Sequence, residues 1–161
     1  MACSLEAGVD RFGRRVVEGG SFSLLNNGID LSLYRCDQAA HEAAKRRLKV
    51  AGRPVFGHVG RLSGEKNHRF LFEVFSQVLR ELPDAVLLLV GRGPLRGELE
   101  RLAQERGLSD SVRFLGVCDD VPGVLKALDV FVFPSTKEGL AMAAVEAQAV
   151  GATCVLSTGV P

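Results

Sequence analysis

The chain has 161 residues, of which 47% are hydrophobic, and its formal net charge at pH 7 is +1. This length fits a single domain, and the hydrophobic content suffices for a core. The near-neutral charge argues against a nucleic-acid-binding or membrane-surface protein, and no apolar run reaches transmembrane length. We therefore expect a globular domain that contacts neither nucleic acid nor a membrane.

The N-terminal segment and the cysteines indicate a cytoplasmic protein. Residues 1–6 lack the basic start and the apolar core of a signal peptide. The four cysteines lie far apart, with no pair at the spacing of a zinc or redox motif: Cys3, Cys36, Cys118 and Cys154. We expect these thiols to be reduced and mostly buried, and we expect no metal site.

Predicted strands and helices alternate through the first half of the chain. Residues 21–25 read as a short strand that ends at a turn signal. A helix is expected over 39–50, where a glycine and a proline then break it, and a strand over 55–60. The clearest helix covers 71–82, because its apolar residues recur at i, i+3 and i+4.

The second half continues the alternation. A continuous apolar run predicts a strand over 85–90 that is covered on both faces. The elements expected after it are a helix over 94–106, a strand over 112–115, a short helix over 121–127, a strand over 130–133, a long helix carrying Glu146 and a strand over 153–156. This order predicts a three-layer α/β fold with a doubly wound, Rossmann-like parallel sheet and right-handed crossovers.

The most informative segment runs from Pro134 to Glu146. It follows a strand and carries two glutamates, Glu138 and Glu146, separated by seven residues. We expect a helix to begin at Gly139, and a helix N-terminus suits a phosphate. Glu138 would then lie at the mouth of the site, with Glu146 about two turns along the helix. Alternatively, Glu138 only complements the helix dipole and Glu146 lies on a solvated stripe.

A second candidate segment is the loop from Gly60 to Asn67. Arg61 and Lys66 follow a strand, at the sheet edge where such folds bind ligands. Arginine can grip two phosphate oxygens and lysine adds a mobile charge. The alternative is a solvated basic loop. We expect Asn67 to cap the following helix and His68, like the other histidines, to be structural.

The glycines at positions 91, 93 and 97 suggest a dinucleotide site only weakly. The third glycine comes one residue later than the fingerprint requires, and Val112–Leu115 is not followed directly by an acidic residue. We expect Pro94 in a first helical turn, and Asp119-Asp120 as a helix cap. An NAD(P)-dependent enzyme therefore remains a minor alternative.

Taken in order, these segments resemble the donor-binding half of family 4 (group 1) retaining glycosyltransferases. The resemblance covers the chain from about Leu25 to Pro161, and the two glutamates have the spacing of the family's E-x7-E motif. It is carried by Asn27-Gly28-Ile29-Asp30, Val59–Leu62 with Lys66-Asn67, Val90–Pro94, Val112–Gly116, Asp129–Ser135 and Glu138-Gly139-Leu140 with Glu146-Ala147.

The resemblance implies catalytic roles for Arg61, Lys66 and Glu138. Arg61 and Lys66 match the basic pair that holds the donor diphosphate and stabilises the leaving group. Glu138 matches the first motif glutamate, beside the transferred sugar. We expect it to orient the sugar, with nucleophilic participation left open.

The resemblance also implies donor-binding roles. Gly139 and Leu140 match the helix start whose amides meet the phosphates, and Glu146 matches the glutamate that binds the ribose hydroxyls. Val117 and Cys118 match the segment that lines the nucleobase. Two positions depart from the family pattern. Family members often have an aromatic residue where this chain has Leu140, or a proline where it has Ala141.

The implied protein is a retaining, metal-independent hexosyltransferase of the two-domain GT-B fold, without a cofactor. Its expected donor is a nucleotide-diphosphate sugar, with UDP as the default nucleotide. Residues 1–20 would be an interdomain connector and 21–161 the donor domain, truncated at both ends. The partner would be an acceptor-binding N-terminal domain of the same protein, so we expect this chain alone to be inactive. Polysaccharide, lipid-linked and small-molecule acceptors stay open. The alternative is a non-catalytic nucleotide-binding or scaffold module.

Overall fold

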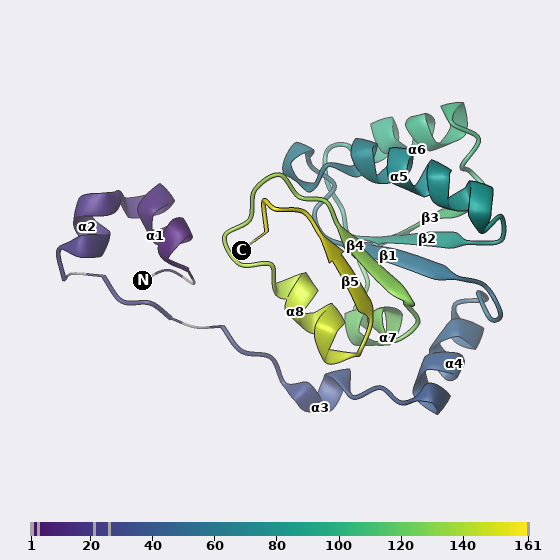
Figure 1. The fold of residues 1–161 in the computed structure, drawn as a ribbon, viewed down its shortest axis with the longest axis horizontal. Helices are drawn as coiled ribbons and strands as arrows, with labels where there is room; N and C mark the ends of the chain where they lie inside the picture. The colour runs from purple at the N-terminus through teal and green to yellow at the C-terminus, as the bar shows by residue number, and fades with distance from the viewer. Residues whose placement is uncertain (1, 3, 21, 26, 161) are drawn as a thin grey trace.

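The computed structural model describes residues 2, 4–20, 22–25 and 27–160, and it contains a five-stranded, all-parallel sheet (Figure 1). The strand order is β3-β2-β1-β4-β5, so the chain reverses its direction of winding between β3 and β4. The expected doubly wound α/β fold is confirmed. The strands are β1 (Val55–Val59), β2 (Val86–Val90), β3 (Val112–Gly116), β4 (Val130–Phe133) and β5 (Thr153–Leu156).

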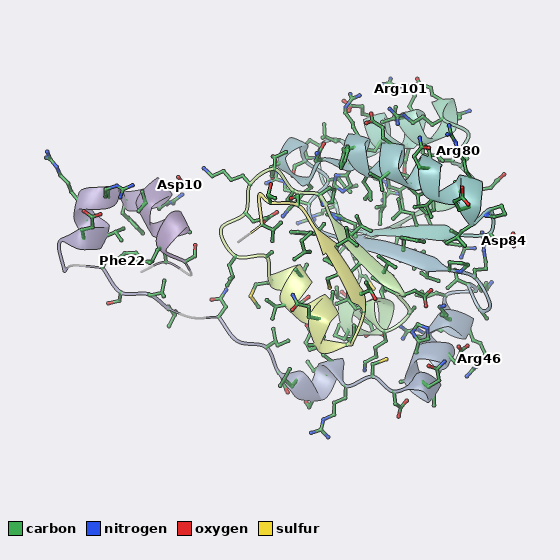
Figure 2. The ribbon with its side chains drawn as sticks, viewed as in Figure 1. Asp10, Phe22, Arg46, Arg80, Asp84 and Arg101 are labelled. Atoms are coloured by element: carbon green, nitrogen blue, oxygen red, sulfur yellow. The ribbon has the colours of Figure 1, made fainter. Side chains whose placement is uncertain are left out.

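Helices cover both faces of the sheet. On one face lie α5 (His68–Glu81) and α6 (Arg96–Glu105), and on the other lie α7 (Val121–Leu125) and α8 (Met142–Ala149) (Figure 1). Every residue of β2 is buried, as expected of a strand between two helical layers. The labelled charged residues Arg46, Arg80 and Arg101 lie at the periphery (Figure 2). Two clusters of buried apolar side chains fill the spaces between the sheet and the helices on its two faces.

The N-terminal part consists of short helices and extended segments that lead into the sheet. It contains α1 (Leu5–Phe12), α2 (Arg14–Glu18), α3 (Leu31–Tyr34) and α4 (Gln38–Arg47). The predicted strand at 21–25 is wrong for the residues described there, because only Leu24 makes an isolated bridge, to Ala2; Ser21 lies outside the described residues. A single bridged pair of residues is too short to form a strand.

The helix predicted to begin at Gly139 begins at Met142 instead. The residues before Met142 form a loop because the backbone turns at Ala141, which has φ −78° and ψ 69°, outside the helical region, and the Met142 amide donates to the carbonyl of Leu140. Asn67 does occupy the cap position of α5, but it adopts a left-handed conformation (φ 53°) and its side chain makes no capping bond. Asp120 caps α7 as expected, by accepting from the Gly123 amide. The helix predicted from Pro94 begins at Arg96.

Candidate functional site

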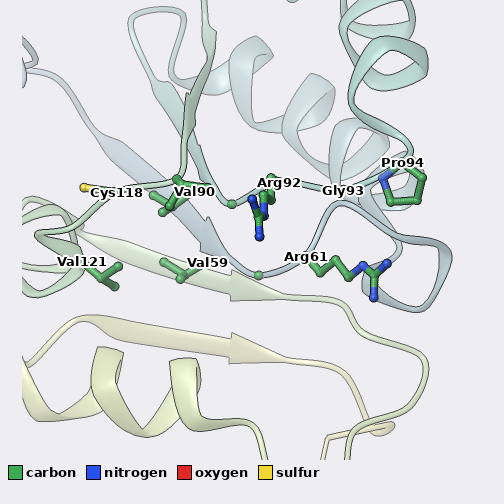
Figure 3. Close-up of a pocket in the computed structure, with 11 residues that line it drawn as sticks. Val59, Arg61, Val90, Arg92, Gly93, Pro94, Cys118 and Val121 are labelled. Atoms are coloured by element: carbon green, nitrogen blue, oxygen red, sulfur yellow. The ribbon is translucent and has the colours of Figure 1, made fainter.

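A cleft of about 910 Å³ opens at the carboxyl ends of β1, β2 and β3 (Figure 3). Its walls include the strand ends Val59 and Val90, and Arg61 and Arg92 extend from the loops that follow β1 and β2. Val117 and Cys118, after β3, close the third side. Figure 3 shows the Arg92 side chain extending toward the loop after β1. The cleft thus combines an apolar floor with two guanidinium groups.

The loops after β1 and β2 are joined through their backbones. The Leu62 amide donates to the carbonyl of Arg92, and the Leu95 amide donates to the carbonyl of Leu62. A Cβ atom at Gly93 would lie 2.2 Å from the Leu62 oxygen, and one at Gly91 would lie 1.9 Å from the Gly60 oxygen. Only glycine permits such an approach of two backbones. This close contact explains why glycine occurs at positions 91 and 93, and no dinucleotide-binding motif is needed to explain it.

Lys66 and Glu138 form an ion pair beside this cleft. The Lys66 Nζ donates to Glu138 Oε1 at 2.5 Å, and the two side chains are only 15% and 11% exposed. Lys66 closes the 3₁₀ turn Gly64–Lys66, and its ammonium also lies 4.8 Å from the ring centre of Phe133 at the end of β4. The segment after β4 is tied to this turn, because the Thr136 amide donates to the Glu65 carbonyl. Two of the expected catalytic side chains therefore meet.

Two buried histidines lie next to the ion pair. His58 on β1 and His68 at the start of α5 are 0% and 2% exposed, and their ring centres are 4.7 Å apart. Burial lowers the pKa of His58 to about 3, and burial followed by the charge of Lys66 lowers the pKa of His68 to about 4. Both imidazoles are consequently neutral at pH 7. A structural role was expected for the histidines, but the sequence did not predict that both would lie close to Lys66.

Glu146 lies midway along α8, where it faces Tyr34 of α3. Tyr34 is buried, and burial together with the Glu146 carboxylate raises the pKa of the Tyr34 hydroxyl. The carboxylate is only half-buried. Glu146 is therefore not simply a residue on a solvated stripe, since it has a specific hydroxyl neighbour on a segment distant in sequence.

Gly139 and Leu140 lie on the loop between β4 and α8, next to α1. A Cβ atom at Gly139 would approach the Ala7 side chain at 3.3 Å, and Lys137 forms an ion pair with Asp10. A shallow hollow of about 360 Å³ separates α1 from Glu138 and Gly139. The N-terminal helix therefore forms a wall opposite the first motif glutamate.

The structure brings the expected residues together in groups. Arg61, Val117 and Cys118 share the cleft, and Lys66 pairs with Glu138, whereas Gly139 faces α1 and Glu146 faces α3. Sequence reasoning missed Arg92 as a lining residue. The signal was present, because Arg92 follows a fully buried strand directly after Gly91, at the same edge as Arg61.

The cysteines and acidic side chains of the described residues do not form a further site of chemical function. Cys36, Cys118 and Cys154 are free thiols there, while Cys3 lies outside the described part. Within the same part, no three or more His, Cys, Asp or Glu side chains gather as a metal-binding group would. No helix in the described ranges has the length and apolar character needed to cross a membrane.

Comparison with known proteins places this geometry in a family. Residues 40–161 match the family described as "Glycosyl transferases group 1". The chain is 39% identical over 160 residues to the putative glycosyltransferase EpsF of Bacillus subtilis, covering 99% of this chain and 42% of that protein. It is 34% identical over 148 residues to an Escherichia coli UDP-Gal:alpha-D-GlcNAc-diphosphoundecaprenol alpha-1,3-galactosyltransferase, covering 88% of this chain and 38% of that protein.

A solved structure extends the likeness to three dimensions. Anabaena HepE, crystallised with UDP and glucose, superposes with a TM-score of 0.84 at 27% identity, over 99% of this chain and 44% of that one. The chain thus spans less than half the length of these relatives. The family match covers most of the chain, and the parallel sheet agrees with it. The chain belongs to the group 1 glycosyl transferases.

Proposed function

We propose that this chain is the donor-binding domain of a retaining glycosyltransferase that uses a nucleotide-diphosphate sugar. The observation that carries the proposal is the cleft at the strand ends, where Arg61 and Arg92 stand above an apolar floor and the Lys66–Glu138 pair lies alongside. Guanidinium groups bind phosphate oxygens in pairs, and apolar walls suit a planar base. One ligand that needs both is a nucleoside diphosphate.

Each part of the donor has a proposed contact. The base lies against Val117 and Cys118, and the diphosphate lies between Arg61 and Lys66. The amides of Gly139 and Leu140 donate hydrogen bonds to the phosphates. They do so from the loop that leads into α8, and not from the first turn of a helix. Glu146 accepts hydrogen bonds from the ribose hydroxyls, with Tyr34 holding its carboxylate.

The proposed transfer depends on electrostatics supplied by the protein. As the bond between the sugar and the diphosphate breaks, negative charge grows on the departing phosphate and positive charge on the sugar. Arg61 and Lys66 stabilise the phosphate, and Glu138 orients the sugar. These fixed cations take the place that a metal ion has in other transferases. An acceptor hydroxyl forms the new bond to the sugar with retention, and its proton passes to the departing phosphate. No cofactor takes part in this scheme.

UDP is the proposed nucleotide. HepE was crystallised with UDP, and the Escherichia coli relative is named for UDP-Gal. Because this chain spans less than half of these relatives, we assign acceptor binding to an N-terminal domain of the longer protein. The transfer itself then needs that domain, and the present chain binds the donor without turning it over.

Calorimetric titration of the chain with UDP, GDP, ADP and NAD tests the proposal. We expect UDP to bind best and Arg61→Ala to weaken that binding about tenfold, because a charge-assisted hydrogen bond is lost. Arg101→Ala is the matched control, since Arg101 is exposed on α6 away from the cleft. Equal weakening by both variants would indicate a general charge effect. Preferential binding of NAD would contradict the proposal.

A further inference from the structure

His58 has an unused hydrogen-bond acceptor beside the Lys66–Glu138 pair. Its Nδ1 lies 3.0 Å from the carbonyl oxygen of Val132. A carbonyl only accepts, so Nδ1 carries the proton and donates to it. In the neutral ring the other nitrogen, Nε2, therefore has a lone pair. Within the described residues this buried nitrogen has no hydrogen-bond partner.

Such a group is costly to bury. An unsatisfied buried polar atom costs about 1–3 kcal/mol, and native proteins keep few of them. The bond from Nδ1 to Val132 accounts for one nitrogen of the ring, but the stacking of His58 on Phe133, at 5.1 Å between ring centres, gives Nε2 no partner. The nitrogen thus needs an explanation other than packing.

Gly60 connects this nitrogen with Lys66. A Cβ atom built on Gly60 would lie 3.0 Å from His58 Nε2 and 3.4 Å from Lys66 Cε. The end of the lysine side chain and the lone pair thus border the same small space, which the missing side chain of Gly60 leaves open. Lys66 is already in contact with Phe133, the ring that stacks on His58.

An ammonium group has three protons to donate, and Glu138 takes one of them in this structure. A bound diphosphate would compete with Glu138 for the Lys66 ammonium. A hydrogen-bond acceptor of the protein would then hold the ammonium in a fixed orientation. His58 stays neutral at pH 7, so its lone pair remains available for that role. His68 packs nearly perpendicular to it, at an interplanar angle of 75°, and fixes the plane of its ring.

We propose that His58 is a positioning residue for Lys66: its Nε2 accepts a hydrogen bond from the ammonium, directly or through one water, when a diphosphate occupies the cleft. Gly60 keeps the path between the two groups open. The inference rests on the proposed function, because it assumes that Lys66 serves the diphosphate. It adds a residue that acts through Lys66 and does not touch the donor.

The test compares UDP with uridine, which lacks the diphosphate, on the 161-residue chain. His58→Phe keeps a flat ring but removes both nitrogens, and we expect it to weaken UDP binding about tenfold while uridine binding is unchanged. His58→Gln retains an acceptor and should recover part of the loss. In the unmodified chain, UDP should shift the ¹⁵N resonance of His58 Nε2 toward that of a hydrogen-bonded nitrogen, and uridine should not.

A stability measurement separates positioning from packing. If His58 only fills space, His58→Phe will change the melting temperature and leave the ratio of UDP to uridine affinity unaltered, which overturns the inference. Lys66→Ala tests the underlying assignment. If that variant keeps the full preference for UDP over uridine, Lys66 does not serve the diphosphate and the proposed function fails at this residue. If only Lys66→Ala lowers the preference, the inference about His58 alone is wrong.

Discussion

Two lysine–carboxylate pairs lie at opposite ends of the same sheet, and they differ in how completely their neighbours are satisfied. At the amino ends of β1 and β4, Lys45 of α4 donates to both oxygens of Asp129, at 2.7 and 2.9 Å, and to the carbonyl of Arg53. Asp129 also accepts from the Val55 amide at 2.6 Å. His41 approaches the same carboxylate at 3.3 Å.

At the carboxyl ends, Lys66 and Glu138 form one contact of 2.5 Å above histidine nitrogens that have no partner in the described part of the chain. A network with every member satisfied rigidifies a fold, whereas a partly satisfied one costs stability. From this contrast we infer that the amino-end pair stabilises the fold. We propose that the carboxyl-end pair keeps polar groups available for a ligand.

The largest expected effect comes from breaking the amino-end pair. Asp129→Ala removes the acceptor of Lys45 and of the Val55 amide, and we expect a loss of about 3 kcal/mol in the free energy of unfolding. Urea denaturation measures it. Titration with UDP at a temperature where the variant is folded should give unchanged affinity. A variant with native stability would show that the network contributes no more than an exposed pair.

The buried histidines at the carboxyl end predict a dependence of stability on acid. The ordinary imidazole pKa is 6.5, and in the fold it falls to about 3 for His58 and about 4 for His68. Between pH 6.5 and about 4 the unfolded chain therefore binds two protons that the folded chain does not, so stability falls as pH falls. The slope from this pair is up to about 3 kcal/mol per pH unit.

His58→Phe isolates half of that slope. It should remove about half of the dependence of stability on pH, so that the variant loses less stability in acid than the unmodified chain. Urea denaturation at a series of pH values gives the two curves. Parallel curves would mean that His58 takes up its proton in the folded state and would refute its buried, neutral character.

The smallest effect is expected at an exposed ion pair on the helix that also carries Lys45. Arg47 lies on α4 two residues after Lys45, and it pairs with Asp120 at the surface, where both side chains are about half exposed. Arg47→Ala should cost only about 0.5 kcal/mol, because solvent screens an exposed pair. The same urea assay compares it with Asp129→Ala. Equal losses in the free energy of unfolding would contradict the contrast between the hydrogen-bonded network of Asp129 and an exposed ion pair.

The strands of the sheet could be predicted from the sequence because each is a mainly apolar run bounded by breakers. Val130–Phe133 and the strand at 153–156 agree with the structure, the other strands of the sheet differ by one residue at an end, and the strand predicted at 21–25 was wrong for the residues described there. The helix start at Met142 could not be predicted, and the start expected at Gly139 was wrong. The backbone turns at Ala141 before the helix begins, and no local residue pattern indicates that turn.

Part of the candidate site could also be predicted from the sequence. Arg61, Val117 and Cys118 follow strands directly, so the rule that ligands bind at the carboxyl ends of strands locates them together. The pairing of Tyr34 with Glu146 and the position of His58 below Lys66 arise from tertiary packing between distant segments. The binding roles assigned to all of these residues remain predictions.

The backbone bonds between the loops after β1 and β2 have a consequence for protein engineering. Since Leu62 and Arg92 are joined through main-chain atoms, an insertion in one loop would displace the other. A chimera that takes either loop from a relative should therefore transfer residues 60–67 and 91–95 together. Grafting either loop alone would mismatch the backbones that meet at Gly93.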